Sequence, residues 1–151
     1  MAPGPGPGVE YAPHGGRLVA YIIDGFIVGI AVTIVALVLT PFLIAGASSE
    51  NAGALAATGF LYVFVVLLVS VSYFPFFWAR NGQTPGMKIF GLRVVRDADG
   101  GKISGGTAII RLIGLWISFA IFYLGIIWIL VDSRRRGWHD LLAGTVVIRQ
   151  P

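Results

Sequence analysis

A single carboxylate, Asp24, lies inside the first long apolar stretch of the chain. Counted from Arg17 at 1.5 Å per residue, it lies about 10 Å along a helix. A charged side chain at a bilayer centre is unfavourable by at least about 2.5 kcal/mol, and a shallower position reduces this penalty without removing it. Two interpretations are open: Asp24 is an ion or proton site, or it is a structural carboxylate that pairs with an arginine and holds helices together.

Two arginines are candidate partners for this carboxylate. Arg17 shares a helix face with Asp24, but helical side chains lean toward the N-terminus, so Arg17 is directed away from it. Arg111 begins the third apolar stretch and is better placed, and its alternative role is that of an anchor at the membrane surface. Because pairing reduces the desolvation penalty of both charges, we predict an Asp24–Arg111 ion pair in the cytoplasmic half of the membrane.

The C-terminal part contains a second group of ionisable residues. A candidate lipid-headgroup site consists of Arg134, Arg135 and Arg136, and the alternative is a cluster that only sets topology. Asp132 is expected to mark a membrane boundary. His139 and Asp140 are adjacent, but no His/Asp set has the spacing of metal ligands, and the chain has no cysteine. We therefore expect no metal site, no cofactor and no enzymatic activity.

The composition indicates that lipid surrounds most of this chain. Of its 151 residues 56% are hydrophobic and only 12% are charged, whereas a soluble domain is about 25% charged. The net charge of +4 comes from basic residues that flank apolar runs, which favours anionic headgroups as partners and excludes a nucleic-acid patch. The sequence thus predicts an integral membrane protein.

Three apolar stretches are long enough to place helices in the membrane. We expect helices over residues 18–45, 54–79 and 108–131, since about 20 apolar residues cross a bilayer. The predicted fold class is an all-α integral membrane protein with two long transmembrane helices, a third apolar segment and a small cytoplasmic β element. The domain is expected to cover residues 17–149, after a disordered Gly/Pro-rich tail over residues 1–16.

The distribution of Lys and Arg predicts the orientation of these segments. Basic residues are enriched on the cytoplasmic side, and Arg17 precedes the first helix while the first loop has no Lys or Arg. The N-terminus and the segment after the second helix are therefore predicted to be cytoplasmic. A full third crossing would place the cluster at residues 134–136 outside, so an in-and-back segment bent near Gly125 is favoured over a spanning one.

Two segments outside the apolar stretches have strand character. Residues 88–96 and 145–149 are rich in β-branched side chains, and we predict that they share a small cytoplasmic sheet in which Val94 lies near Val147. The turn at residues 97–101 would let residues 102–104 pair back as a hairpin. Extended loops are the alternative for both segments.

Four motifs in order resemble the RDD family. They are residues 17–24 (RLVAYIID), residues 82–88 (GQTPGMK) followed by residues 91–95 (GLRVV), Arg111, and residues 139–147 (HDLLAGTVV). The resemblance covers residues 16–149. It implies that Arg17 and Asp24 are the arginine and the first aspartate for which the family is named, and that the second is Asp140, with Asp132 as the alternative.

The resemblance implies a membrane protein whose activity is open, with transport, including cation/proton exchange, as one suggestion. We expect a multi-pass protein of the cell membrane with both termini cytoplasmic. The favoured function is an accessory or scaffold module, and the alternative is a homo-oligomeric transporter that uses Asp24. The expected partners are the lipid bilayer and further copies of the chain or other membrane proteins.

Overall fold

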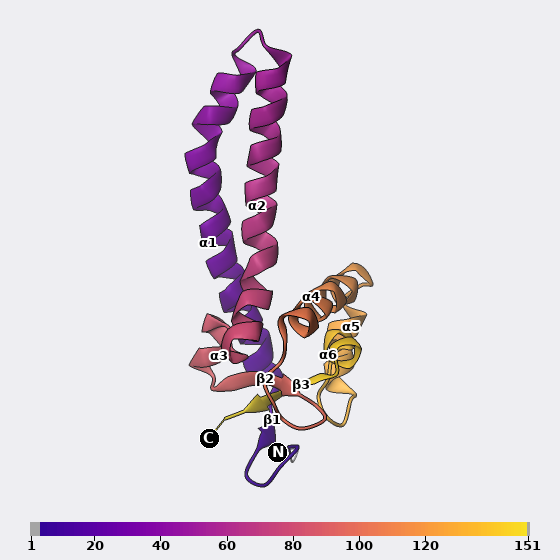
Figure 1. Cartoon of the computed structure of the whole chain (residues 1–151). Helices are drawn as coiled ribbons and strands as arrows, with labels where there is room; N and C mark the ends of the chain where they lie inside the picture. The colour runs from indigo at the N-terminus through magenta and orange to yellow at the C-terminus, as the bar shows by residue number, and fades with distance from the viewer. Residues whose placement is uncertain (1–3, 151) are drawn as a thin grey trace. The chain divides into compact units, whose positions relative to one another are not determined.

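The computed structural model describes residues 4–150. The elements in chain order are β1 (Glu10–Tyr11), α1 (His14–Ala47), α2 (Ala52–Asn81), α3 (Pro85–Ile89), β2 (Leu92–Arg96), α4 (Gly105–Ala120), α5 (Leu124–Ile127), the 3₁₀ helix η1 (Trp128–Leu130), α6 (Trp138–Ala143) and β3 (Thr145–Arg149) (Figure 1). The fold is mostly helical with one small sheet, as predicted. It divides into two units, one formed by residues 25–73 and the other by the remaining residues.

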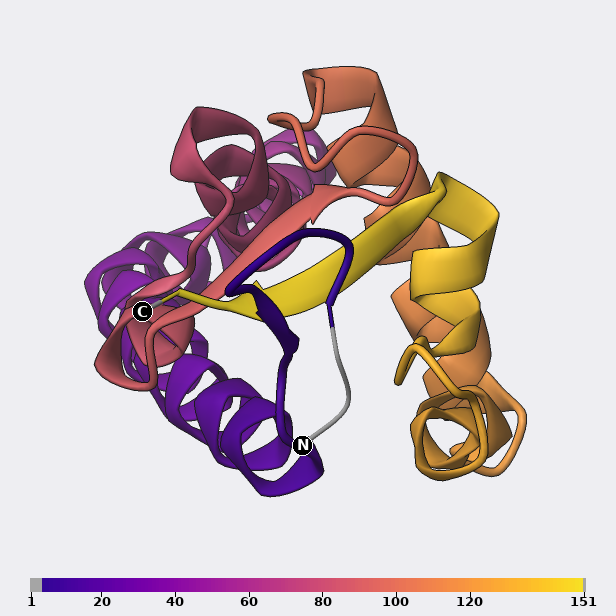
Figure 2. The same ribbon diagram turned by 90° about the horizontal axis from the view of Figure 1, so that it is seen from below.

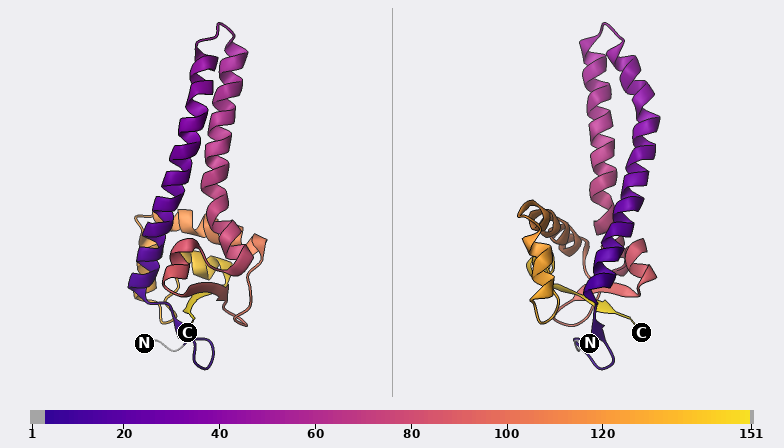
Figure 3. Two further views of the ribbon diagram at one scale, coloured as in Figure 1. Left: turned by 90° about the vertical axis from the view of Figure 1, so that its left-hand side faces the viewer. Right: turned by 180° about the vertical axis from the view of Figure 1, so that it is seen from behind.

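The unit of residues 25–73 is a helical hairpin. It contains most of α1 and α2, and Figure 3 shows the two helices running side by side to their connecting loop. Gly46 allows a close approach, because a Cβ there would overlap the side chain of Thr58. Large apolar side chains remain exposed along both helices; Phe26 and Phe60, for example, are 70% and 71% exposed. Both helices are long and apolar enough to cross a membrane, as predicted.

The second unit is built around a three-stranded antiparallel sheet. Its strand order is β1-β3-β2, and β3 lies between its two partners in Figure 2. Val94 is the cross-strand partner of Val147, which confirms the predicted pairing. The sheet buries Leu92, Val94, Val146 and Val147, so the high content of β-branched residues in both segments is explained by their contact with the core.

Three details of the sheet differ from the sequence-based expectation. Residues 85–89 form α3, so the strand predicted from residue 88 begins at Leu92. The expected hairpin is wrong: β2 pairs with β3, while Ser104 caps α4 by accepting the Thr107 N–H. The expected disordered tail contains β1 at residues 10–11 and the start of α1 at His14, because Tyr11 finds an apolar site against Val95 and Val146.

The third apolar segment is bent. α4 ends at Ala120, Phe122 and Tyr123 adopt positive φ angles of 50° and 60°, and the following α5–η1 piece is inclined by 109° to α4. Gly125 lies so close to Ser118 that a Cβ there would overlap it, which lets the chain fold back. The bend predicted near Gly125 is confirmed, and the apolar segment expected over residues 108–131 consists of these shorter helical pieces.

Candidate functional site

Three charged side chains from distant parts of the sequence meet in the interior of the second unit. Arg17 of α1 donates from Nη2 to Oδ2 of Asp140 in α6 over 2.7 Å, and Nη1 of Arg111 in α4 binds the other carboxylate oxygen. The Arg111 and Asp140 side chains are fully buried, and that of Arg17 is 2% exposed. We refer to Arg17, Arg111 and Asp140 as the Arg-Asp-Arg cluster.

The start of α6 and the start of β3 position this cluster. Asp140 is the third residue of α6, and its Oδ2 also accepts the backbone N–H of the N-cap residue Gly137 over 2.9 Å. Gly137 has no room for a side chain, because a Cβ would press on the His139 ring. α6 ends at Ala143, and its C-cap Gly144, with a φ of 62°, turns the chain into β3. There the Thr145 hydroxyl accepts from Arg111 Nη1 over 2.7 Å.

Arg111 is held by an aromatic face as well as by oxygen atoms. Its guanidinium carbon lies 4.7 Å from the centre of the Trp78 ring, a cation–π arrangement that partly replaces the lost hydration. Within the described residues, its Nε and Nη2 atoms make no hydrogen bond. The predicted Asp24–Arg111 ion pair is therefore wrong. The carboxylate that binds Arg111 is that of Asp140, because α6 packs against α4.

His139 is buried beside the cluster as a neutral imidazole. Its Nε2 atom lies 3.1 Å from the Tyr21 hydroxyl and 3.4 Å from Arg17 Nη2, and both groups donate hydrogen bonds. Nε2 is thus assigned as the acceptor and Nδ1 as the protonated nitrogen. Burial, reinforced by Arg111 and Arg17 and opposed by Asp140, lowers the pKa of His139 to about 3.

Asp140 is ionised throughout the physiological range. Burial alone would raise its pKa, but Arg111 and then Arg17 outweigh that effect and hold the pKa below its usual value. Because both carboxylate oxygens already accept from donors, Asp140 is poorly suited to accept a proton. The ion pairs of Asp140 with Arg17 and Arg111 connect α6 to α1 and to α4.

Asp24 lies at a separate position and caps a different helix. One of its carboxylate oxygens accepts the Gly86 N–H over 2.8 Å, and the other accepts the Thr84 hydroxyl over 2.5 Å. Thr84 is the N-cap of α3, with Pro85 next to it. Only glycine fits at position 86, because a Cβ there would overlap the Ala20 carbonyl oxygen and the Asp24 carboxylate. The GQTPGMK motif is thus a turn built to receive the Asp24 carboxylate.

The three consecutive arginines are not equivalent. Arg134 and Arg136 bind Asp97 over 3.0 and 3.2 Å, and Arg136 also binds Asp132 over 3.0 Å. Burial alone would raise the pKa of Asp132, but hydrogen bonds from Arg136 outweigh it and lower that pKa. No ion pair joins Arg135 to a carboxylate within residues 4–150, so only Arg135 of the predicted headgroup site lacks an internal acidic partner.

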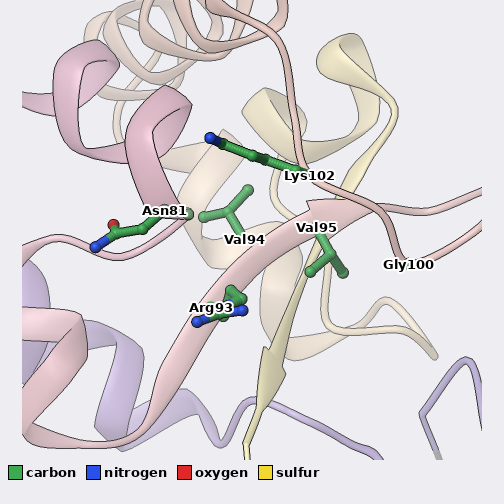
Figure 4. Close-up of a pocket in the computed structure, with 7 residues that line it drawn as sticks. Asn81, Arg93, Val94, Val95, Gly100 and Lys102 are labelled. Carbon is green, nitrogen blue, oxygen red and sulfur yellow. The ribbon is translucent and has the colours of Figure 1, made fainter.

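A small pocket of about 150 Å³ lies at the end of α2, next to β2. Its polar residues are Asn81, Arg93 and Lys102, but Figure 4 shows Arg93 and Lys102 on opposite sides of the strand. Their charges therefore do not converge on one ligand position. Among the described residues no group of three His, Cys, Asp or Glu side chains could hold a metal ion.

The long apolar helices and the buried Arg-Asp-Arg cluster define a small helical membrane protein. The model of the RDD family matches residues 11–144, and the chain belongs to that family. Its expected signature residues therefore fall in two places: Arg17 and Asp140 bind each other, whereas Asp24 caps α3. Sequence reasoning did not find Tyr21, Thr84 and Gly86 as members of these sites, although all three lie within the quoted motifs.

Three uncharacterized bacterial proteins are similar to this chain. The uncharacterized protein YxaI of Bacillus subtilis is 32% identical over 142 residues, which cover 87% of this chain and 93% of that protein. The uncharacterized protein YckC of the same organism is 33% identical over 136 residues, covering 87% and 80%. The uncharacterized protein RP437 of Rickettsia prowazekii is 34% identical over 83 residues, covering 55% and 46%. No solved structure matches the chain.

Proposed function

We propose that this protein is a non-catalytic accessory or scaffold module of the cell membrane. The observation that carries the proposal is the state of its two buried carboxylates. Asp140 is bound by two guanidinium groups, and Asp24 accepts hydrogen bonds from Thr84 and Gly86. A carboxylate that carries an ion or a proton has to exchange partners, whereas both of these carboxylates connect elements of the fold.

The proposed scaffold works through its surface. The hairpin of residues 25–73 carries large exposed apolar side chains on both helices, and such faces suit packing against other membrane helices. The partners in this proposal are further copies of the chain or other membrane proteins. The proposed orientation has both termini in the cytoplasm, with the α4–α5–η1 segment entering and leaving on that side.

Transport is the competing function, because Asp24 is fully buried in a helix long enough to span the membrane. Purified protein in liposomes, assayed with a cation gradient and an internal pH dye, separates the two functions. The scaffold proposal expects flux equal to that of protein-free liposomes for the wild type and for Asp24→Asn. Cation or proton flux that Asp24→Asn abolishes, and that the exposed control Asp99→Asn keeps, would establish transport instead.

A further inference from the structure

An apolar groove lies between the first turns of α1 and the α5–η1 piece. It has a volume of about 300 Å³, and its walls include His14, Leu18, Tyr21, Ile126, Ile127 and Leu130. All of these residues belong to the same unit of the fold. The volume is at the lower end of the range of about 300–1,000 Å³ that is typical of small-molecule pockets.

The walls of this groove suit a hydrocarbon chain. Leu18 is 58% exposed and Leu130 is 63% exposed, so the apolar surface continues outward from the groove. The groove begins at the N-terminal end of a helix that can span the membrane. A lipid acyl chain is the apolar molecule that is present in excess at this position.

Beside the groove lies Arg135, a cation that forms no ion pair with an acidic residue within residues 4–150. Arg17, which also lines the groove, donates from Nη1 to the Arg135 carbonyl over 2.5 Å, and Arg135 Nη1 donates to the Ala12 carbonyl over 3.2 Å. These contacts fix Arg135 near the start of α1. Asp97 and Asp132 neutralise the two neighbouring arginines but form no ion pair with Arg135.

The backbone of Arg135 is also unusual. Its φ of 55° is in the left-handed region, which is unfavourable for a residue with a long side chain. Such strain persists where surrounding contacts impose it, and it is found preferentially at ligand-binding sites. Here the hydrogen bond from Arg17 helps to hold the strained backbone, and with it the Arg135 side chain, beside the groove.

We propose that the groove is a binding site for one anionic phospholipid, with an acyl chain between α1 and α5–η1 and the phosphate on Arg135. The guanidinium matches the phosphate in charge and in hydrogen-bond geometry, and the walls match the chain. This site goes beyond the scaffold function. The sequence predicted a headgroup site of three arginines. In this proposal the headgroup binds Arg135 alone, and the groove binds the acyl chain.

The test uses the delipidated full-length protein in detergent, titrated with phosphatidylglycerol or phosphatidylcholine of identical acyl chains and observed by native mass spectrometry. The wild type should bind phosphatidylglycerol about fivefold more tightly, the effect expected of one additional cationic contact. Arg135→Asn should abolish this preference, because asparagine tolerates the positive φ but has no charge. Ile127→Trp should weaken binding of both lipids by filling the groove.

Arg134→Asn is the matched control, since it removes a neighbouring charge that is already bound to Asp97. It should keep the lipid preference. Equal binding of the two lipids by the wild type would overturn the proposal, whether or not any variant folds. So would equal effects of the two Asn variants, or unchanged binding in Ile127→Trp. Efficient disulfide formation between copies of Leu130→Cys in membranes would show that a second copy covers the groove, and would also overturn it.

Discussion

Asp140 accepts hydrogen bonds from two buried guanidinium groups and one backbone N–H. The cluster therefore contains two cations and only one anion. The neighbouring imidazole adapts to this excess of positive charge. Two donors face Nε2 of His139, and burial among the arginines keeps the ring neutral. Protonation of His139 would therefore place a third cation in the cluster.

We predict that the free energy of unfolding decreases as the pH falls from 6.5 to 4.5. The unfolded chain takes up a proton on His139 near its ordinary pKa of 6.5, whereas the folded protein does so only near 3. The stabilisation is therefore complete above pH 6.5 and is lost progressively toward pH 3, with roughly 2 kcal/mol lost by pH 4.5. Asp132 and Asp140, with pKa values below the usual 3.8, do not titrate in this window.

Denaturant unfolding in detergent at several pH values measures this slope. His139→Gln should remove most of it, because glutamine has no group that titrates. His14→Gln is the comparison: partial burial, Arg135 and Arg17 also lower the pKa of His14, but its shift is smaller, so this change should leave most of the slope in place. If His139→Gln and the wild type lose stability in parallel between pH 6.5 and pH 4.5, His139 is not kept neutral by the fold.

At the scale of elements, α3 is a five-residue helix that depends on its cap. A helix of this length has little stability of its own, and its first N–H groups are satisfied by Thr84 and by the Asp24 carboxylate. The close approach at Gly86 brings α3 against α1. The Asp24 contact is therefore expected to fix the turn between α2 and β2.

We predict that Gly86→Ala lowers the stability of the protein by about 1–3 kcal/mol, because the new Cβ forces Asp24 or the Ala20 carbonyl to move. Thr84→Ala should lose about 0.5–2 kcal/mol through the missing cap, and Thr84→Ser should restore most of it. The melting temperature in detergent measures both effects. Gly105→Ala is the control, since a Cβ there meets no atom within 4 Å; a decrease equal to that of Gly86→Ala would refute the steric explanation.

The elements could be predicted from the sequence to different degrees. The length of the apolar stretches identified α1 and α2, and β-branched residues identified the β2–β3 pair, because these signals are local. α3 was not predicted, since its helix depends on a carboxylate sixty positions away in the chain. Arg111 was paired with Asp24 because both were expected to enter the membrane from the cytoplasmic side. The correct partner, Asp140, depends on the packing of α6 against α4, and no local sequence pattern indicates this contact.

At the scale of the whole molecule, the proposed orientation leads to a labelling prediction. The chain has no cysteine, so single cysteines can be introduced without background. Cysteines at Ser133 and Gln150 should resist an impermeant thiol reagent in intact cells, because the basic residues around them favour the cytoplasm. A cysteine at Ser49, in the loop between α1 and α2, should react. Ready labelling at both Ser133 and Gln150 would instead establish a full third crossing.

The Arg-Asp-Arg cluster joins α1, α4 and α6, and a double-mutant cycle between Arg111 and Asp140 tests it most directly. The measurement is the free energy of unfolding in detergent of the wild type, Arg111→Leu, Asp140→Asn and the double mutant. Arg111→Leu combined with Asp24→Asn gives the comparison cycle. Asp140→Asn leaves two buried guanidinium groups without their carboxylate and should destabilise by about 3–5 kcal/mol. Arg111→Leu leaves Asp140 bound to Arg17 and should destabilise by less. The double mutant should lose less than the sum, with a coupling of about 0.5–3 kcal/mol, and the comparison cycle should be close to additive. Additivity for Arg111 with Asp140, or equal coupling of Arg111 to Asp24, would contradict this account of the cluster.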